Sequence, residues 1–136
     1  MSAGEQGEVS ISSESDIVAA RKVVREAAMK MAFGITDVTR IVTAASELAR
    51  NVFQYAETGT MHWRIVENEE YWGIELSFED QGPGIADIEE ALQAGFSTSG
   101  GLGFGLPGAK RLMDEMEIES SAGAGTRVTV RKWHPR

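Results

Sequence analysis

Three groups of polar and glycine residues in this chain could do chemistry, and they lie far apart in the sequence. The first is Glu47 with Asn51, four residues later. On a helix this spacing places both side chains on one face. A carboxylate there could orient or deprotonate a hydroxyl group, and an amide oxygen is a neutral ligand suited to Mg²⁺. Taken alone, such a pair is more often an exposed polar pair, so its context must decide.

The second group, Asp80 with Gly82 and Gly84, directly follows a strand-like segment. Strand alternation directs Asp80 to the same side as Phe78, toward the buried layer. Burying a carboxylate is costly unless it accepts hydrogen bonds, and the exocyclic amino group of a purine is a suitable donor. The two glycines would let the backbone approach a flat ring closely. The competing interpretation is a turn made by Asp, Gly and Pro.

The third group is a glycine-rich run, in a chain where eight of the fifteen glycines fall between positions 82 and 108. The run exposes backbone amides and then opens a helix, whose N-terminal dipole attracts phosphate. It follows a loop, which argues against a dinucleotide fingerprint, and no Ser or Thr follows Lys110, which argues against a P-loop. A flexible linker is disfavoured by the interleaved hydrophobic residues. The predicted phosphate-binding residues are Ser97, Thr98, Ser99, Gly101, Leu102, Gly103, Phe104, Gly105 and Leu106.

Regular elements must bring these groups together, and their order predicts the class of fold. Apolar residues recur at helical spacing in three long segments and alternate in the strand-like ones. Helices and paired strands in this order favour an α/β two-layer sandwich, with a mostly antiparallel mixed sheet and helices on one face. The predicted strands are 8–12, 61–67, 71–80, 117–121 and 126–133, and the predicted helices are 13–33, 36–56, 87–93 and 106–116.

Composition limits the classes of function. The 136 residues fit one domain, 1–136, with 1–7 as a loose start. A net charge of −8 disfavours nucleic acid and anionic membranes as partners. Because there is no cysteine, disulfides, thiolate catalysis and cysteine-bound zinc are excluded. The chain has neither a membrane-length apolar run nor a signal-peptide pattern at its start, so we expect it in the cytoplasm.

The three groups together resemble the motifs of a known family. The segments 47–51, 80–84 and 101–106 are similar to the N, G1 and G2 boxes of the GHKL ATPases, which include gyrase, Hsp90, histidine kinases and MutL. Gly125 and Thr126 resemble the last box, so the resemblance covers nearly the whole chain. The chain most resembles the small stand-alone serine/threonine switch kinases of bacterial stress-response partner-switching. This resemblance implies the Bergerat-type ATP-binding fold.

The resemblance also implies a role for each matching residue. Glu47 would be the catalytic base, Asn51 the Mg²⁺ ligand and Asp80 the adenine anchor. Thr126 would lie near the adenine end. Gln81 stands where many relatives have Asn, and Gln54 and Tyr55 stand where they often have Lys or His. One phosphate contact is therefore expected either to be missing or to come from elsewhere. The remaining implied ligand residues are Gly82 and Gly84 beside the base and the glycine run beside the phosphates.

The implied function is a Mg-ATP-dependent serine/threonine protein kinase. Its implied substrates are STAS-domain antagonist or scaffold proteins of a stress-signalling complex, the stressosome. A PP2C-type phosphatase activated by binding is a further implied partner. The alternative is a nucleotide-dependent binding module, such as an anti-sigma factor or a phosphatase activator, without essential kinase turnover.

Overall fold

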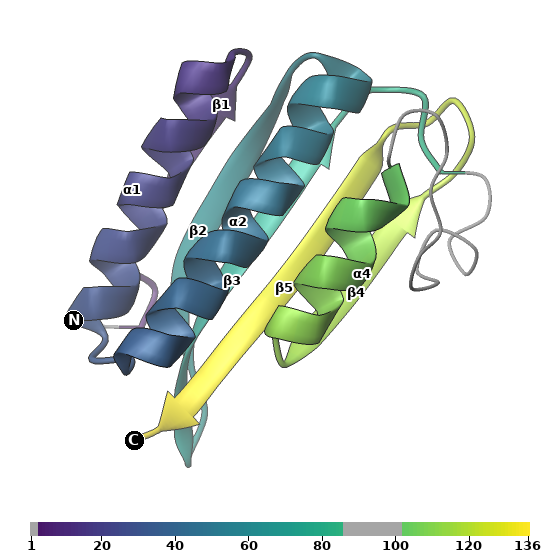
Figure 1. Cartoon of the computed structure of the whole chain (residues 1–136). Coiled ribbons are helices and arrows are strands. Elements are labelled where there is room, and N and C mark those ends of the chain that lie inside the picture. The colour runs from purple at the N-terminus through teal and green to yellow at the C-terminus, as the bar shows by residue number, and fades with distance from the viewer. Residues whose placement is uncertain (1–2, 86–101) are drawn as a thin grey trace.

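Three helices lie on one face of a five-stranded sheet, and the opposite face of the sheet carries no described helix (Figure 1). The computed structural model describes residues 3–85 and 102–136. The helix predicted at 87–93 lies outside these ranges. Within them, the predicted α/β two-layer sandwich is confirmed.

The sheet has the strand order β1-β2-β3-β5-β4, with β3 at its centre. All four pairings in the described part are antiparallel, so these residues form an antiparallel sheet where the prediction allowed a mixed one. Two of these pairings, β2 with β3 and β4 with β5, connect consecutive strands through short turns. The strands are β1 (Gln6–Ile11), β2 (Gly59–Glu67), β3 (Tyr71–Asp80), β4 (Glu115–Ser120) and β5 (Thr126–Pro135).

The chain joins the sheet earlier than the sequence predicted. Strand β1 begins at Gln6, and the amide of Gly4 already donates to the carbonyl of Ile65 at 2.9 Å. Glu5 accepts from the Ile65 amide at 2.8 Å. The expectation of a loose start is therefore wrong for residues 4–7. These polar residues show no apolar alternation because they lie on an edge strand, where backbone pairing decides the structure.

Helices α1 (Glu14–Lys30) and α2 (Ile35–Ala56) follow the predicted segments closely. Each has an apolar stripe at three- and four-residue spacing that faces the sheet. The stripe of α2 is rich in alanine and small side chains, which lets this helix lie close against the strands. Its buried residues are Val38, Ile41, Val42, Ala44, Ala45, Ser46, Leu48, Ala49 and Val52.

Helix α4 (Leu102–Leu112) begins and ends four residues before its predicted range, and the prediction that 115 and 116 are helical is wrong. Ala109, Leu112 and Met116 have helical spacing, which misled the sequence interpretation. The Asp114 amide instead donates to the Arg131 carbonyl at 2.9 Å, and this bond starts the pairing of β4 with β5. The ammonium group of Lys132 donates to the Leu112 carbonyl at 3.0 Å and so caps the end of the helix.

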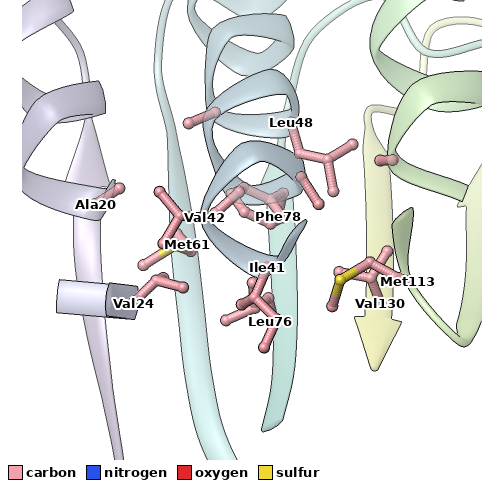
Figure 2. Packing of buried hydrophobic residues seen from close by; sticks show 14 of the residues in the cluster. Ala20, Val24, Ile41, Val42, Leu48, Met61, Leu76, Phe78, Met113 and Val130 are labelled. Atoms are coloured by element: carbon pink, nitrogen blue, oxygen red, sulfur yellow. The ribbon is translucent and has the colours of Figure 1, made fainter. Parts of the chain in front are cut away.

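One hydrophobic core fills the space between the two layers (Figure 2). Leu76 and Phe78 of β3 lie under α2, where Ile41 and Leu48 are also at most 2% exposed. Burying a side chain of this size stabilises the fold by about 1.5–3 kcal/mol. The core therefore fixes α2 over the central strand, and that placement positions the polar residues at the ends of both elements.

The face of the sheet away from the helices carries a set of ion pairs centred on Glu75. Its two carboxylate oxygens accept from Arg64 Nε at 2.7 Å and from Arg131 Nε at 2.8 Å. Cross-strand register places these three residues opposite one another on β2, β3 and β5. Glu75 can therefore be 8% exposed without leaving its charge unpaired.

None of the helices in the described part is long and apolar enough to cross a membrane.

Candidate active site

A pocket opens where the C-terminal end of β3 meets the last turns of α2, and it brings predicted residues from separate segments together. The register pairs Asp80 with Thr126, the first residue of β5, and with Gly59, the first residue of β2. Leu106 of α4 closes another side. The pocket is lined by Leu48, Asn51, Val52, Tyr55, Phe78, Asp80, Pro83, Gly84, Ile85, Leu106, Thr126 and Val128.

Asp80 supplies the carboxylate of this pocket. Phe78 and Asp80 both line it, as the alternation of β3 predicts. Burial raises the pKa of Asp80, and hydrogen bonds from the backbone amides of Gly82 and Thr126 offset only part of that rise. The Gly82 amide lies 2.9 Å from Asp80 Oδ1. The carboxylate is thus held in one orientation by the backbone and still lacks full compensation for its lost water.

The hydroxyl of Ser120 determines the role of the Thr126 hydroxyl. Ser120 Oγ accepts from the Ile85 amide at 2.8 Å and donates its single proton to the Gly125 carbonyl at 2.8 Å. The Ser120 proton is thus already used. In the third contact, at 2.9 Å, the Thr126 hydroxyl must therefore donate its proton to Ser120 Oγ. Thr126 is left with acceptor capacity, as is the Asp80 carboxylate. Two neighbouring acceptors suit an amino group such as that of adenine, whereas the carbonyl oxygen of guanine would be repelled.

Two glycines join the loop after β3 to the turn between β4 and β5. Gly84 has φ +75°, and a Cβ at this position would collide with the Ser121 carbonyl oxygen. Gly125 has φ +79°, and a Cβ there would collide with the Asp80 carbonyl oxygen. Only glycine combines this backbone conformation with such close approach. Gly84 is one of the residues that line the pocket.

Gly82 lies beside the pocket and does not line it. A Cβ on Gly82 would come within 2.7 Å of Ala56 Cβ, so this glycine allows the turn to pack against the end of α2. Its contribution to the site in this structure is the hydrogen bond from its amide to Asp80.

Asn51 and Tyr55 face the pocket from α2, one helical turn apart. The Asn51 Nδ2 and Tyr55 hydroxyl atoms are both buried, and neither has a hydrogen-bond partner among residues 3–85 and 102–136. Buried polar atoms are nearly always paired in native proteins. Two such atoms in one pocket, beside two acceptors, fit a ligand that carries both donors and acceptors, as a nucleotide does. The donor set thus fits the predicted ATP, and the amide of Asn51 is of the type that Mg²⁺ accepts.

Glu47 lies on α2 one turn before Asn51 and is not among the pocket-lining residues. Its side chain is 37% exposed, and its carboxylate lies 3.5 Å from the Arg50 guanidinium. The structure therefore places Glu47 next to the pocket with access to water.

Only the C-terminal part of the glycine-rich run, from Leu102 onward, belongs to the described residues. Leu102, Gly103, Phe104 and Gly105 form the first turn of α4, and Leu106 is buried and lines the pocket. The predicted loop thus becomes helix from position 102. Ser97, Thr98, Ser99 and Gly101 lie outside the described residues, so their predicted contacts with phosphate stay predictions.

Sequence reasoning missed Ser120 and gave Tyr55 no place in the site. Ser120 is one of several serines near strand ends, and only the fold shows that three segments meet at its hydroxyl. Tyr55 could have been found, because a residue four positions after Asn51 must share its helix face.

Comparison with known proteins agrees with this geometry. The family model of the histidine kinase-like ATPase domain matches residues 11–132. The serine/threonine-protein kinase RsbT of Bacillus subtilis (strain 168) is 50% identical over 129 residues, which cover 95% of this chain and 97% of that protein. An anti-sigma F factor of Caldanaerobacter subterraneus subsp. tengcongensis is 33% identical over 124 residues, with 84% and 82% coverage.

Among solved structures, a chain in the crystal structure of the SiaB-SiaC complex from Pseudomonas aeruginosa is similar, with a TM-score of 0.55. That match has 15% sequence identity and covers 97% of this chain and 91% of the other, so it supports the fold alone. The match to the family model and the 50% identity to RsbT establish the family to which the chain belongs. The chain belongs to the histidine kinase-like ATPase family and, within it, to the RsbT-like serine/threonine-protein kinases.

Proposed function

We propose that this kinase transfers the γ-phosphoryl group of Mg-ATP to a serine or threonine hydroxyl of a STAS-domain partner in a bacterial stress-signalling complex, the stressosome. The observation that carries the proposal is the convergence of Asn51, Asp80 and Thr126 on one pocket from α2, β3 and β5. These residues are widely separated in the sequence, and a nucleotide-sized ligand is what would need them together. The proposed place of action is the cytoplasm, where ATP is available.

In the proposed chemistry, one end of the pocket binds the adenine base and the other end binds the phosphates with Mg²⁺. Asp80 and Thr126 accept hydrogen bonds from the adenine amino group and so orient the base. Asn51 would hold Mg²⁺ through its amide oxygen, and the ion would neutralise developing charge on the phosphates when bound. The backbone amides in the first turn of α4 would interact with the negatively charged phosphates of the nucleotide.

Glu47 is the proposed base for the incoming hydroxyl. Glu47 lies one helical turn before Asn51, which lines the pocket, and its side chain is 37% exposed, so a partner's side chain could approach it. Accepting or orienting the hydroxyl proton there helps the attack on phosphorus. Because Glu47 does not line the pocket, its role concerns the partner's hydroxyl more than the binding of the nucleotide.

The direct test is transfer of ³²P from labelled ATP to a purified STAS-domain protein. Asn51→Ala should abolish transfer. Asn68→Ala is the matched control, because Asn68 lies in the turn between β2 and β3, at the opposite end of β3 from Asp80. The proposal fails if the unmodified protein, with Mg-ATP and a panel of STAS-domain proteins, forms no phosphoprotein.

A second candidate function has its own support in the 33% identity to the anti-sigma F factor. In this alternative the nucleotide only stabilises a shape that binds a partner, such as a sigma factor or a PP2C-type phosphatase. Stoichiometric complex formation without turnover would favour it over the kinase.

A further inference from the structure

We infer that Lys132 is a positioning residue for the phosphate end of the pocket: its buried ammonium group holds the C-terminal end of α4, and this keeps the first turn of that helix where it can bind phosphate. The inference rests on the proposed function, because it concerns the same bound nucleotide. Lys132 bonds to the end of α4 that is away from the pocket, and it is not among the residues that line the pocket.

The first support is the set of contacts that the Lys132 ammonium group makes. The side chain is 10% exposed, and its Nζ atom lies 3.8 Å from Asp37 Oδ1. The same atom donates to the Leu112 carbonyl at 3.0 Å and to Asp114 Oδ1 at 3.3 Å. Burying a cation is costly unless it is paired, so these three partners hold the ammonium group in one place.

The second support is that two of these partners belong to the helices that flank the pocket. Leu112 is the last residue of α4, and Asp37 lies in the first turn of α2. Figure 1 shows the two helices side by side and antiparallel on one face of the sheet. Further along these helices, Leu106 of α4 and Asn51 of α2 line the pocket. Lys132 therefore helps to fix the position of α4 relative to the helix that carries the proposed Mg²⁺ ligand.

The third support is the composition of α4, which is unfavourable for a helix. Its 11 residues include three glycines, and Pro107 lies inside the helix. Glycine and proline are the least favourable residues in a helix interior, so tertiary contacts must keep this segment helical. Leu106 and Ala109 supply one such contact through their burial in the core. Lys132 supplies another at the last carbonyl, where a cation also interacts favourably with the helix dipole.

Loss of this cap should affect the two ends of the pocket differently. Helix formation is cooperative, so loosening the end of a short helix also loosens its first turn. Backbone amides favour phosphate when that first turn is formed. Asp80 and Thr126, which are proposed to bind the base, lie on β3 and β5 and do not belong to α4. Binding of ATP should therefore weaken while binding of adenosine stays the same.

The test compares Lys132→Met with the unmodified protein in calorimetric titrations with adenosine and with Mg-ATP. Affinity for Mg-ATP should fall about three- to tenfold, and affinity for adenosine should not change. Lys132→Gln gives the same comparison should Lys132→Met not fold, and Lys132→Arg, which keeps the charge, should restore the Mg-ATP affinity. Lys110→Met is the matched control, because Lys110 is an exposed cation in the last turn of α4 and should change neither constant.

A second variant keeps Lys132 and strengthens the helix in another way. Gly108 lies within α4, and a Cβ at this position would meet no described atom within 4 Å. Because alanine favours a helix over glycine, Gly108→Ala should strengthen Mg-ATP binding about two- to fivefold and leave adenosine binding unchanged. Combined with Lys132→Met, it should recover part of the lost Mg-ATP affinity.

Three results would overturn the inference. Equal losses for adenosine and Mg-ATP in the Lys132 variants would show that Lys132 only supports the fold as a whole. Unchanged affinities for both ligands would show that the end of α4 does not affect the pocket. No gain from Gly108→Ala in either background would contradict the link between helix order and phosphate binding.

These binding measurements are separate from the test of the proposed function. An unmodified protein that transfers no phosphoryl group, but whose Mg-ATP affinity depends on Lys132 as described, would contradict the proposed function and leave this inference standing. A protein that phosphorylates its partner, with equal losses for both ligands in Lys132→Met, would do the opposite.

Discussion

The carboxylate of Asp80 and the backbone amide of Gly82 are joined by a 2.9 Å hydrogen bond across the turn that follows the central strand. The bond fixes the direction of the carboxylate, yet burial still raises the pKa of Asp80. The folded chain therefore binds this proton more tightly than the unfolded chain. The free energy of unfolding falls as the pH rises between the unfolded and the folded pKa, so the ionised carboxylate destabilises the ligand-free protein near neutral pH.

Replacing Asp80 with asparagine should separate stability from function. Because the asparagine side chain carries no charge, the melting temperature of the ligand-free Asp80→Asn variant should rise slightly near pH 7, and the gain should shrink as the pH falls toward 3.8. Loss of a charged acceptor should weaken ATP binding about 10- to 100-fold. Calorimetric melting and titration measure the two effects. Glu79→Gln is the control, since Glu79 pairs with Arg127 at 3.0 Å and does not line the pocket. A lower melting temperature for Asp80→Asn at pH 7 would contradict the expectation.

Substituting Gly84 should destabilise the fold far more than substituting a glycine of similar φ in open space. Gly84→Ala puts a Cβ against the Ser121 carbonyl and adds backbone strain, with an expected loss of about 2–4 kcal/mol. Gly123 has φ +77° but open space around its Cβ, so Gly123→Ala should lose only about 1 kcal/mol. Urea unfolding of both variants measures the difference. Equal losses would mean that the contact with Ser121 is unimportant.

Replacing Glu47 with glutamine should affect turnover and leave nucleotide binding nearly unchanged. The catalytic rate should fall about 10²- to 10⁴-fold, because a base is lost. The free energy of unfolding should change by no more than about 0.5 kcal/mol, because the pair with Arg50 is exposed. Steady-state phosphorylation and ATP titration test this split. Glu26→Gln, on the exposed side of α1, controls for removing one negative charge. A change in ATP affinity as large as the change in rate would place Glu47 in the binding site instead.

The ion pairs of Glu75 should make the fold sensitive to acid. Burial alone would raise the pKa of Glu75, but hydrogen bonds from Arg64 and Arg131 outweigh it and lower the pKa below 4.5. The stabilisation is therefore complete above pH 4.5 and is lost as the pH falls through the lowered pKa. Glu75→Gln should cost about 1–3 kcal/mol at neutral pH and flatten the loss of stability in acid. Glu117→Gln should have little effect, because that side chain is 64% exposed. The expectation would be refuted if the free energy of unfolding fell equally steeply with decreasing pH in Glu75→Gln and in the unmodified protein.

The elements with strong periodicity could be predicted from sequence, and those decided by partners could not. The alternation of β3 and the stripe of α2 place Asp80 and Asn51 correctly, because each pattern has one buried face. The predicted end of α4 is wrong because Met116 suits both a helix stripe and an alternating strand. The bond from Asp114 to Arg131 decides between them, and that bond depends on a residue from a different strand, β5.

Several residues that line the candidate pocket could be predicted from the sequence, whereas the hydrogen bonds that support them could not. Asp80 stands out because the alternation of β3 directs a charged side chain toward the buried layer, and Asn51 because it is a polar residue beside the apolar stripe of α2. The proton of Thr126 is committed to Ser120, and no spacing in the sequence reveals this. Such supporting bonds depend on the close approach of Gly84 and Gly125 to neighbouring backbone, which appears only in the folded chain.

Ser120 uses its whole hydrogen-bonding capacity on Ile85, Gly125 and Thr126, which belong to two different parts of the chain. No other side chain of similar size offers one donor and two acceptors in that arrangement, apart from threonine. Two of the three partner groups, the Ile85 amide and the Gly125 carbonyl, belong to the backbone and do not depend on the side chains at those positions. Evolutionary divergence in this fold is therefore expected to retain a hydroxyl side chain at positions 120 and 126 together, even where the surrounding surface changes.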